Sequence, residues 1–142
     1  MRVVFNTNIV ASASFWRDKP FDCLAAWTQG RCVAIVSPQI LCEYFETLEE
    51  LQGRYPGRPR VEWAEGLTDS AELVFPANRA RGATADPEDE MFLECALAGD
   101  AEAIVSGDEK HLLSMRHWRG ISILSAAEFL ALLKNLPRQP AA

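Results

Sequence analysis

Four residues that are far apart in the sequence have the side chains needed for a divalent cation site. They are Asn6, Glu43, Asp89 and Asp108. Hard cations such as Mg²⁺ prefer oxygen ligands and are usually held by one or two carboxylates together with substrate phosphate. Such an ion polarises a phosphoryl oxygen and lowers the pKa of a bound water. Carboxylates gathered around such an ion therefore favour phosphodiester hydrolysis, if the fold brings them together.

The elements that must position these residues follow from the hydrophobic pattern. Short apolar runs alternate with longer stretches of helical period, which predicts one α/β domain over residues 1–136 with a mainly parallel sheet and helices on both faces. Residues 137–142 are expected to form a flexible tail. Strands are predicted at 1–5, 32–36, 72–75, 103–105 and 121–124. Helices are predicted at 20–29, 38–51, 61–70, from 86–87 to 99, and from 126 to about 135, the last with a Ser125/Glu128 capping box.

This arrangement predicts that the four residues meet at one edge of the sheet. Asn6 follows the first strand directly, and Asp108 follows the fourth. Glu43 lies in the second turn of the helix after the second strand, and Asp89 lies in the first turn of the helix that leads into the fourth strand. Ligands of open α/β sheets bind just beyond the carboxyl ends of the strands. All four side chains can reach that edge.

Taken singly, each residue also has a simpler interpretation. Asp89 sits where an acid complements a helix macrodipole. Glu43 shares its helix with other glutamates and could be solvated, and Asp108 could be a turn residue beside Gly107. Asn6 could be a turn former. Only their combination indicates a site.

Composition limits the function classes. The net charge is −6 at pH 7, which argues against nucleic-acid binding through a general basic surface. No apolar run is long enough to span a bilayer, and the N-terminus lacks a signal-peptide pattern, so we expect a cytoplasmic protein. The four cysteines show no zinc spacing and are predicted to be buried free thiols: Cys23, Cys32, Cys42 and Cys95. The two histidines, His111 and His117, are interpreted as surface or loop residues.

Four segments, in order, resemble the PIN domain, a nuclease fold used by many toxins of bacterial toxin–antitoxin pairs. The opening Val-Val-Phe-Asn-Thr-Asn resembles the family's strand that ends in Asp-Thr-Asn. The other three segments are Ser37 to Glu43, Asp86 to Ala96, and Ile104 to Asp108 with the following Leu112-Leu113. The resemblance covers roughly residues 1 to 130.

The resemblance implies a three-layer α/β/α sandwich and Mg²⁺- or Mn²⁺-dependent cleavage of RNA. By position it implies that Glu43, Asp89 and Asp108 are metal ligands, with Asp86 as a helix cap. It also implies supporting roles for three small polar residues that orient the carboxylates, namely Thr7, Asn8 and Ser106. Toxins of this kind usually form homodimers or higher homo-oligomers, and a cognate antitoxin protein blocks them.

Position 6 departs from the family pattern, because Asn6 stands where the family has its first aspartate. An amide oxygen can still coordinate a metal, but one negative charge is lost. The lost attraction to a divalent ion amounts to a few kcal/mol at an effective dielectric constant of ~20. The sequence is compatible with two origins of Asn6: a substitution made to silence a harmful nuclease, and natural divergence. Either would weaken or silence the endoribonuclease.

Two other functions compete with the nuclease. A catalytically silent PIN-like module that binds RNA or protein is favoured by Asn6. A phosphotransfer or nucleotide-binding domain lacks support, because no Gly-rich phosphate loop occurs. Arginines that could meet RNA phosphates, or be merely solvated, are Arg54, Arg58, Arg60, Arg79, Arg81, Arg116 and Arg119. The sequence is compatible with a place in the core, in a dimer interface or on a partner-binding surface for each of the four tryptophans, Trp16, Trp27, Trp63 and Trp118.

Overall fold

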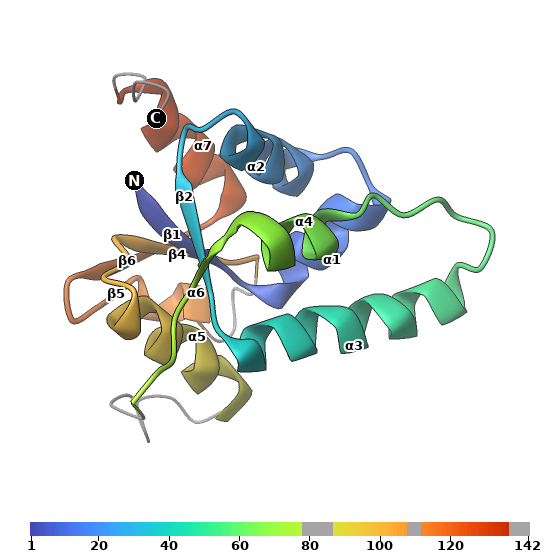
Figure 1. The fold of residues 1–142 in the computed structure, drawn as a ribbon. Helices are drawn as coiled ribbons and strands as arrows, with labels where there is room; N and C mark the ends of the chain where they lie inside the picture. The colour runs from blue at the N-terminus through green and yellow to red at the C-terminus, as the bar shows by residue number, and fades with distance from the viewer. Residues whose placement is uncertain (78–86, 108–111, 137–142) are drawn as a thin grey trace.

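The computed structural model describes residues 1–77, 87–107 and 112–136 of the 142-residue chain (Figure 1). The strands are β1 (Arg2–Phe5), β2 (Val33–Val36), β3 (Glu72–Leu73), β4 (Ala103–Val105), β5 (His117–Trp118) and β6 (Ile121–Leu124). The helices are α1 (Thr7–Phe15), α2 (Lys19–Thr28), α3 (Pro38–Arg54), α4 (Trp63–Ser70), α5 (Pro87–Ala98), α6 (Leu112–Met115) and α7 (Ala126–Lys134). The predicted helix and strand positions are confirmed to within a few residues.

The strands form one sheet in the order β3-β2-β1-β4-β6-β5, and only the β5–β6 pair is antiparallel. The chain steps from β1 outward to β2 and β3, then returns to β4 on the other side of β1. Because parallel crossovers are right-handed, α1 to α4 cover one face and α5 and α6 cover the other. Helix α7 packs against α2 and so joins the first face. This is a three-layer α/β/α fold, as expected.

Three elements were absent from the sequence-based prediction: α1, α6 and β5. The first of these matters most, since α1 begins directly after Asn6. The sequence Thr-Asn-Ile-Val-Ala-Ser-Ala-Ser-Phe mixes β-branched and small polar residues, so it has neither a strong helical propensity nor a clear polar face. Its burial explains the pattern, because most of its residues are inaccessible to solvent. Residues 6–8 are therefore a helix start and not a loop.

The core lies on both faces of the sheet. The strand residues Val3, Val4 and Ile104 are fully buried, and the ring of Phe5 meets Phe129 of α7 edge-on at 6.1 Å. The most deeply buried residues of α3 are Ile40, Tyr44 and Leu48, which have the i, i+4, i+8 spacing of one helix face. Within the described ranges, no helix is long and apolar enough to cross a membrane.

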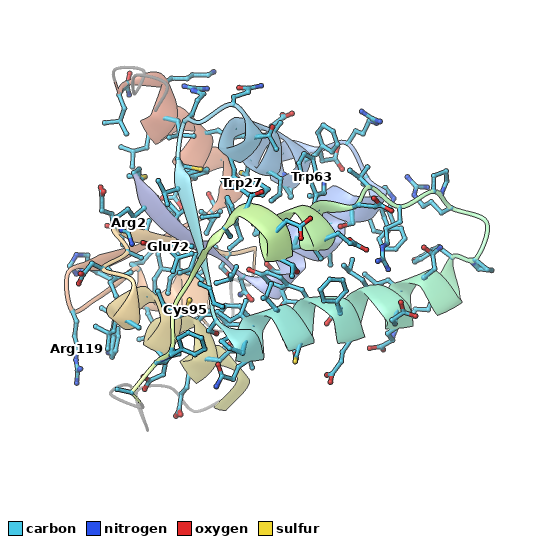
Figure 2. All side chains as sticks on the ribbon, viewed as in Figure 1. Arg2, Trp27, Trp63, Glu72, Cys95 and Arg119 are labelled. Atoms are coloured by element: carbon cyan, nitrogen blue, oxygen red, sulfur yellow. The ribbon has the colours of Figure 1, made fainter. Side chains whose placement is uncertain are left out.

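The edge of the sheet is tied to the core by an arginine. The guanidinium of Arg2 donates to the carbonyl of Gly99 and forms an ion pair with Glu72 (Figure 2). Gly99 itself must be a glycine, since a Cβ there would approach Ile35 Cγ2 to 2.6 Å. These contacts join the start of β1, the start of β3 and the residue after α5, at the end of the sheet where the parallel strands begin.

One smaller expectation is wrong. Cys23, Cys32 and Cys95 are buried free thiols as predicted, but Cys42 is exposed. Its neighbours Ile40 and Tyr44 lie on the face of α3 that packs against the core, whereas Cys42 lies on a different face of the helix. An apolar sequence context therefore did not determine its burial. His117 is exposed as predicted, although it lies in β5 and not in a loop. His111 and the expected flexible tail at 137–142 lie outside the described residues.

Candidate metal centre

The candidate site lies where the strand order reverses. Strands β2 and β4 flank β1 on opposite sides, so the crevice between the ends of β1 and β4 is the switch point of the sheet. Asn6 follows β1 and Ser106 follows β4. The backbone N–H of Asn6 donates to the carbonyl of Val105 at 2.9 Å, which fixes the two strand ends side by side. This is the place where an open α/β sheet binds ligands.

Both polar atoms of the Asn6 side-chain amide form hydrogen bonds. Its Oδ1 accepts from the backbone N–H of Thr7 at 2.7 Å, and its Nδ2 donates to Ser106 Oγ at 2.8 Å. The orientation of the amide follows from the chemistry, because an N–H of the backbone can only face the oxygen. Asn6 is also the N-cap of α1 and is 6% exposed. The side chain is therefore held rigidly at the switch point.

A second bond joins the same two segments slightly further out. The backbone N–H of Gly107 donates to Oδ1 of Asn8 at 3.1 Å. Asn8 is exposed, whereas Ser106 is fully buried. The structure thus brings together Asn6, Asn8 and Ser106 as a polar network that ties the start of α1 to the turn after β4.

Glu43 is placed by its neighbour in the sequence. Tyr44 is fully buried, and its hydroxyl donates to the carbonyl of Phe5, the residue before Asn6. The second turn of α3 is thereby held against the end of β1. Glu43 itself is partly exposed. Tyr44 was not singled out from the sequence, because a tyrosine on an apolar helix face gives no sign that its hydroxyl reaches a strand end.

Two acids of α5, Asp89 and Glu94, are more deeply buried than surface acids usually are. Asp89 is 8% exposed and Glu94 is 7% exposed. Acidic residues are almost never buried unless other groups interact with them. Glu94 was not singled out from the sequence, since it lies among the apolar residues of the helix. Asp108, predicted as a ligand, and Asp86, predicted as a helix cap, lie outside the described residues.

The first turn of α3 is linked to α5 through a thiol. Ser37 caps α3 with its hydroxyl, which accepts from the N–H of Ile40, and the same side chain hydrogen-bonds to Cys95. Burial raises the pKa of Cys95 from 9.0 to about 12, an effect that outweighs this hydrogen bond. Burial also raises the pKa of Tyr44 well above its ordinary value. Both groups stay neutral near pH 7 and act as structural supports.

The donor set fits a hard divalent cation. The predicted ligands Asn6, Glu43 and Asp89 would each coordinate a cation through a side-chain oxygen, as Mg²⁺ and Mn²⁺ prefer. Next to Asn6, the Oγ1 atom of Thr7 is buried without a hydrogen-bond partner in the described structure. An orphaned buried hydroxyl is costly, and an oxygen of a hydrated ion would satisfy it. Among the described residues no three His, Cys, Asp or Glu side chains form a metal-binding group.

The comparisons with known proteins bear on this site. The family model described as PIN domain matches residues 2–110, which include β1, α3, α5 and β4. The chain belongs to the PIN domain family. PIN domains are typically nucleases and generally use divalent metals, which agrees with an oxygen-rich switch point. The comparison with curated proteins found no match.

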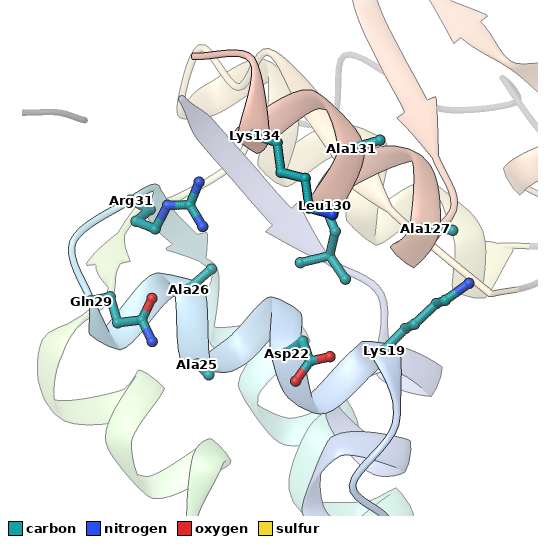
Figure 3. Close-up of a pocket in the computed structure, with 10 residues that line it drawn as sticks. All are labelled: Lys19, Asp22, Ala25, Ala26, Gln29, Arg31, Ala127, Leu130, Ala131 and Lys134. Atoms are coloured by element: carbon teal, nitrogen blue, oxygen red, sulfur yellow. The ribbon is translucent and has the colours of Figure 1, made fainter. Parts of the chain in front are cut away.

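A cavity of about 530 Å³ lies away from the predicted metal-site residues of this PIN domain. It is formed between α2 and α7, and Leu130 projects into the space between the two helices (Figure 3). Its charged residues are Lys19, Asp22, Arg31 and Lys134. None of the predicted site residues contributes to it. It is therefore separate from the candidate metal centre.

Proposed function

We propose that this PIN domain is an Mg²⁺- or Mn²⁺-dependent endoribonuclease whose activity Asn6 weakens. The observation that supports the proposal is the position of Asn6 at the switch point, where its amide bonds to Ser106 Oγ at 2.8 Å, since the family resemblance implies a carboxylate ligand at this position. Asn6, Glu43, Asp89 and Asp108 would hold the cation. When bound, the ion would supply charge neutralisation at the scissile phosphate and acidify water.

The chain's own residues prepare that site. Ser106 fixes the orientation of the Asn6 amide, and Tyr44 fixes the distance between α3 and β1. The buried position of Asp89 keeps its carboxylate away from competing bulk water. Preorganised ligands of this kind lose little free energy to rearrangement when a cation and a phosphate enter.

The role in the cell follows from the same resemblance. We propose a toxin of a toxin–antitoxin pair that acts in the cytoplasm as a homodimer or higher homo-oligomer. A cognate antitoxin that covers the acidic crevice would inhibit it. Co-expression with the product of the adjacent reading frame, followed by purification through a tag on one partner, tests this part; recovery of the tagged chain alone contradicts it.

The catalytic part is tested by RNA cleavage in Mn²⁺, with EDTA as the control. The chain and the variant Asn6→Asp are compared, since the aspartate restores the missing charge with little change in shape. We expect cleavage by Asn6→Asp to exceed that by the chain by at least tenfold, and to vanish when Asp89→Asn is added. An Asn6→Asp protein that binds no divalent ion and cuts no RNA contradicts the proposal and leaves a silent binding module.

A further inference from the structure

Aromatic rings and arginines line a second cavity, which lies at the C-terminal end of α1. It has a volume of about 470 Å³, and its lining includes Trp16, Arg17, Arg58 and Pro59. Pockets of 300–1,000 Å³ are the usual size for small ligands. The cavity lies between the C-terminal end of α1 and the connection from α3 to α4. It is distinct from the candidate metal centre at the other end of α1.

Arg58 is held in one orientation within this cavity. Its Nε donates to the carbonyl of Phe15 at 2.7 Å, and its guanidinium lies over the ring of Trp16 at 4.9 Å. Tyr55 meets the same indole edge-on at 5.6 Å. A guanidinium stacked on one side presents its other planar face and its terminal N–H groups outward. Arg58 is thus a planar cation that has already lost most of its conformational freedom.

The backbone around Arg58 is fixed as well. The last carbonyls of α1 have no partner within the helix, and the α3–α4 connection and the first residue of α4 supply donors for them. Val61 N–H donates to the carbonyl of Ser14 at 2.8 Å, and the indole N–H of Trp63 donates to that of Ala13 at 3.1 Å. The cavity is therefore built from a rigid frame and not from a loose loop.

The arginines in this region differ in whether a carboxylate pairs with them. Arg54 pairs with Glu50, and Arg60 pairs with Glu49 and Glu65. In contrast, Arg17 and Arg58 form no ion pair with any carboxylate that the structure describes. Arg17 instead lies over the ring of Phe21 at 4.8 Å. Two cations that pair with no carboxylate among the described residues thus line one cavity of a protein whose net charge is −6.

We infer that this cavity binds a nucleotide of single-stranded RNA, with its base stacked on the Arg58–Trp16 pair and its phosphate at Arg17. Single-stranded RNA is recognised by stacking on aromatic rings and arginine planes, with cations on the backbone. Helix α1 begins at the candidate metal centre and is about 14 Å long. The inference rests on the proposed ribonuclease function: the cavity would hold the strand a few nucleotides from the centre at which it is cut, with the strand lying on the surface around the buried helix α1.

The alternative role of Arg58 is to cap the C-terminus of α1 and nothing more. Binding of a fluorescein-labelled single-stranded RNA of about 12 nucleotides, measured by anisotropy in EDTA, separates the two roles. Among the described residues, the side chain of Arg17 makes no hydrogen bond to the backbone, so we expect Arg17→Ala to leave the frame intact. We expect Arg17→Ala and Arg58→Ala each to weaken binding by about fivefold or more. Arg58→Lys, which keeps the charge and loses the plane, should fall between Arg58→Ala and the unchanged chain.

The matched control is Arg54→Ala, because Arg54 is an exposed arginine of the same region whose charge Glu50 already compensates. It should change the affinity less than twofold. RNA carrying 5-iodouracil should crosslink to Trp16 or Tyr55. The inference is overturned if the unchanged chain binds no RNA, if Arg17→Ala and Arg58→Ala bind like Arg54→Ala, or if crosslinks form only elsewhere.

These results are independent of catalysis. If Asn6→Asp cuts no RNA but the cavity variants lose binding, the cavity is a binding site and the nuclease proposal fails. If Asn6→Asp cuts RNA and its KM is unchanged by Arg17→Ala, the nuclease proposal stands and the cavity inference fails. Unlabelled duplex RNA should compete poorly, since its bases are not free to stack; equal competition by the duplex contradicts the inference.

Discussion

The side-chain amide of Asn6 donates to the hydroxyl of Ser106 at 2.8 Å, although 100 positions separate the two residues in the sequence. The bond crosses the switch point between β1 and β4, and both residues are buried. It shows that a polar contact, and not only the sheet, fixes the two strand ends that bear the candidate metal centre. The bond also explains how an asparagine is accommodated at this position.

Removal of the Ser106 hydroxyl should destabilise the fold. In Ser106→Ala the buried Nδ2 of Asn6 keeps its desolvation cost and loses its acceptor, so we expect a loss of about 1–3 kcal/mol in the free energy of unfolding. Urea denaturation measures it. Ser70→Ala, at an exposed position at the end of α4, is the control and should stay within about 0.5 kcal/mol of the unchanged chain. A loss no larger than that of the control would show that the bond contributes nothing.

Restoration of a carboxylate at position 6 should make stability depend on metal. The aspartate of Asn6→Asp can still accept from the N–H of Thr7, and the Ser106 hydroxyl can rotate to donate to it. A ligand that binds only the folded state stabilises it in proportion to its affinity. We therefore expect Mn²⁺ to raise the Tm of Asn6→Asp by several degrees more than that of the unchanged chain, as measured by differential scanning fluorimetry.

The control for that experiment is a charge added elsewhere. Asn135→Asp introduces the same charge at the C-cap of α7, away from the switch point. Its response to Mn²⁺ should equal that of the unchanged chain. If both aspartate variants respond alike, the effect is general charge neutralisation and no site at position 6 is needed to explain it.

Much of the fold could be predicted from the sequence, because strong local signals coincide with the elements. The continuous apolar run of β2, the Ser37-Pro38 start of α3 and the Ser125/Glu128 capping box each led to an element that the structure contains. Helix α1 was missed since its sequence has no polar face to reveal a helical period, and its stability comes from burial in the tertiary structure.

The candidate site was predicted in part, and for a physical reason. Strand ends mark where ligands bind, so Asn6 and Asp108 could be predicted to lie at one edge before any contact was known, whereas Ser106 was singled out only by the family resemblance. Contacts between distant segments could not be foreseen, because the reach of one side chain depends on packing. Tyr44 is the main example, since its hydroxyl meets the Phe5 carbonyl only after α3 has docked.

Loss of the Tyr44 hydroxyl should loosen α3 from β1. Tyr44→Phe keeps the ring in the core but leaves the buried carbonyl of Phe5 without this donor, so we expect a loss of about 1–2 kcal/mol in the free energy of unfolding. Urea denaturation again measures it. Tyr55→Phe is the matched control, because Tyr55 is 44% exposed and its hydroxyl can turn to water. Equal stability of the two variants would mean that the Tyr44 bond is not a net contributor.

The buried thiols should make the protein lose stability at alkaline pH. Burial raises the pKa values of Cys23, Cys32 and Cys95 from 9.0 to about 12. Between these values the unfolded chain has released the thiol protons and the folded chain has kept them. The unfolded state then binds fewer protons, so the free energy of unfolding falls as pH rises, by about 1.4 kcal/mol per pH unit for each thiol. Below about pH 9 the thiols should add no pH dependence.

A single replacement isolates one thiol from the other groups that titrate in this range. Cys95→Ser keeps the size of the side chain and removes its titration, so the slope of unfolding free energy against pH should become shallower by about 1.4 kcal/mol per unit above about pH 9.5. Urea unfolding under reducing conditions at several pH values measures that slope. Cys42→Ser, at the exposed cysteine, is the matched control for the replacement of a thiol by a hydroxyl. If Cys95→Ser keeps the original slope, then Cys95 ionises as readily in the folded chain as in the unfolded one, and its burial beside Ser37 does not protect the thiol.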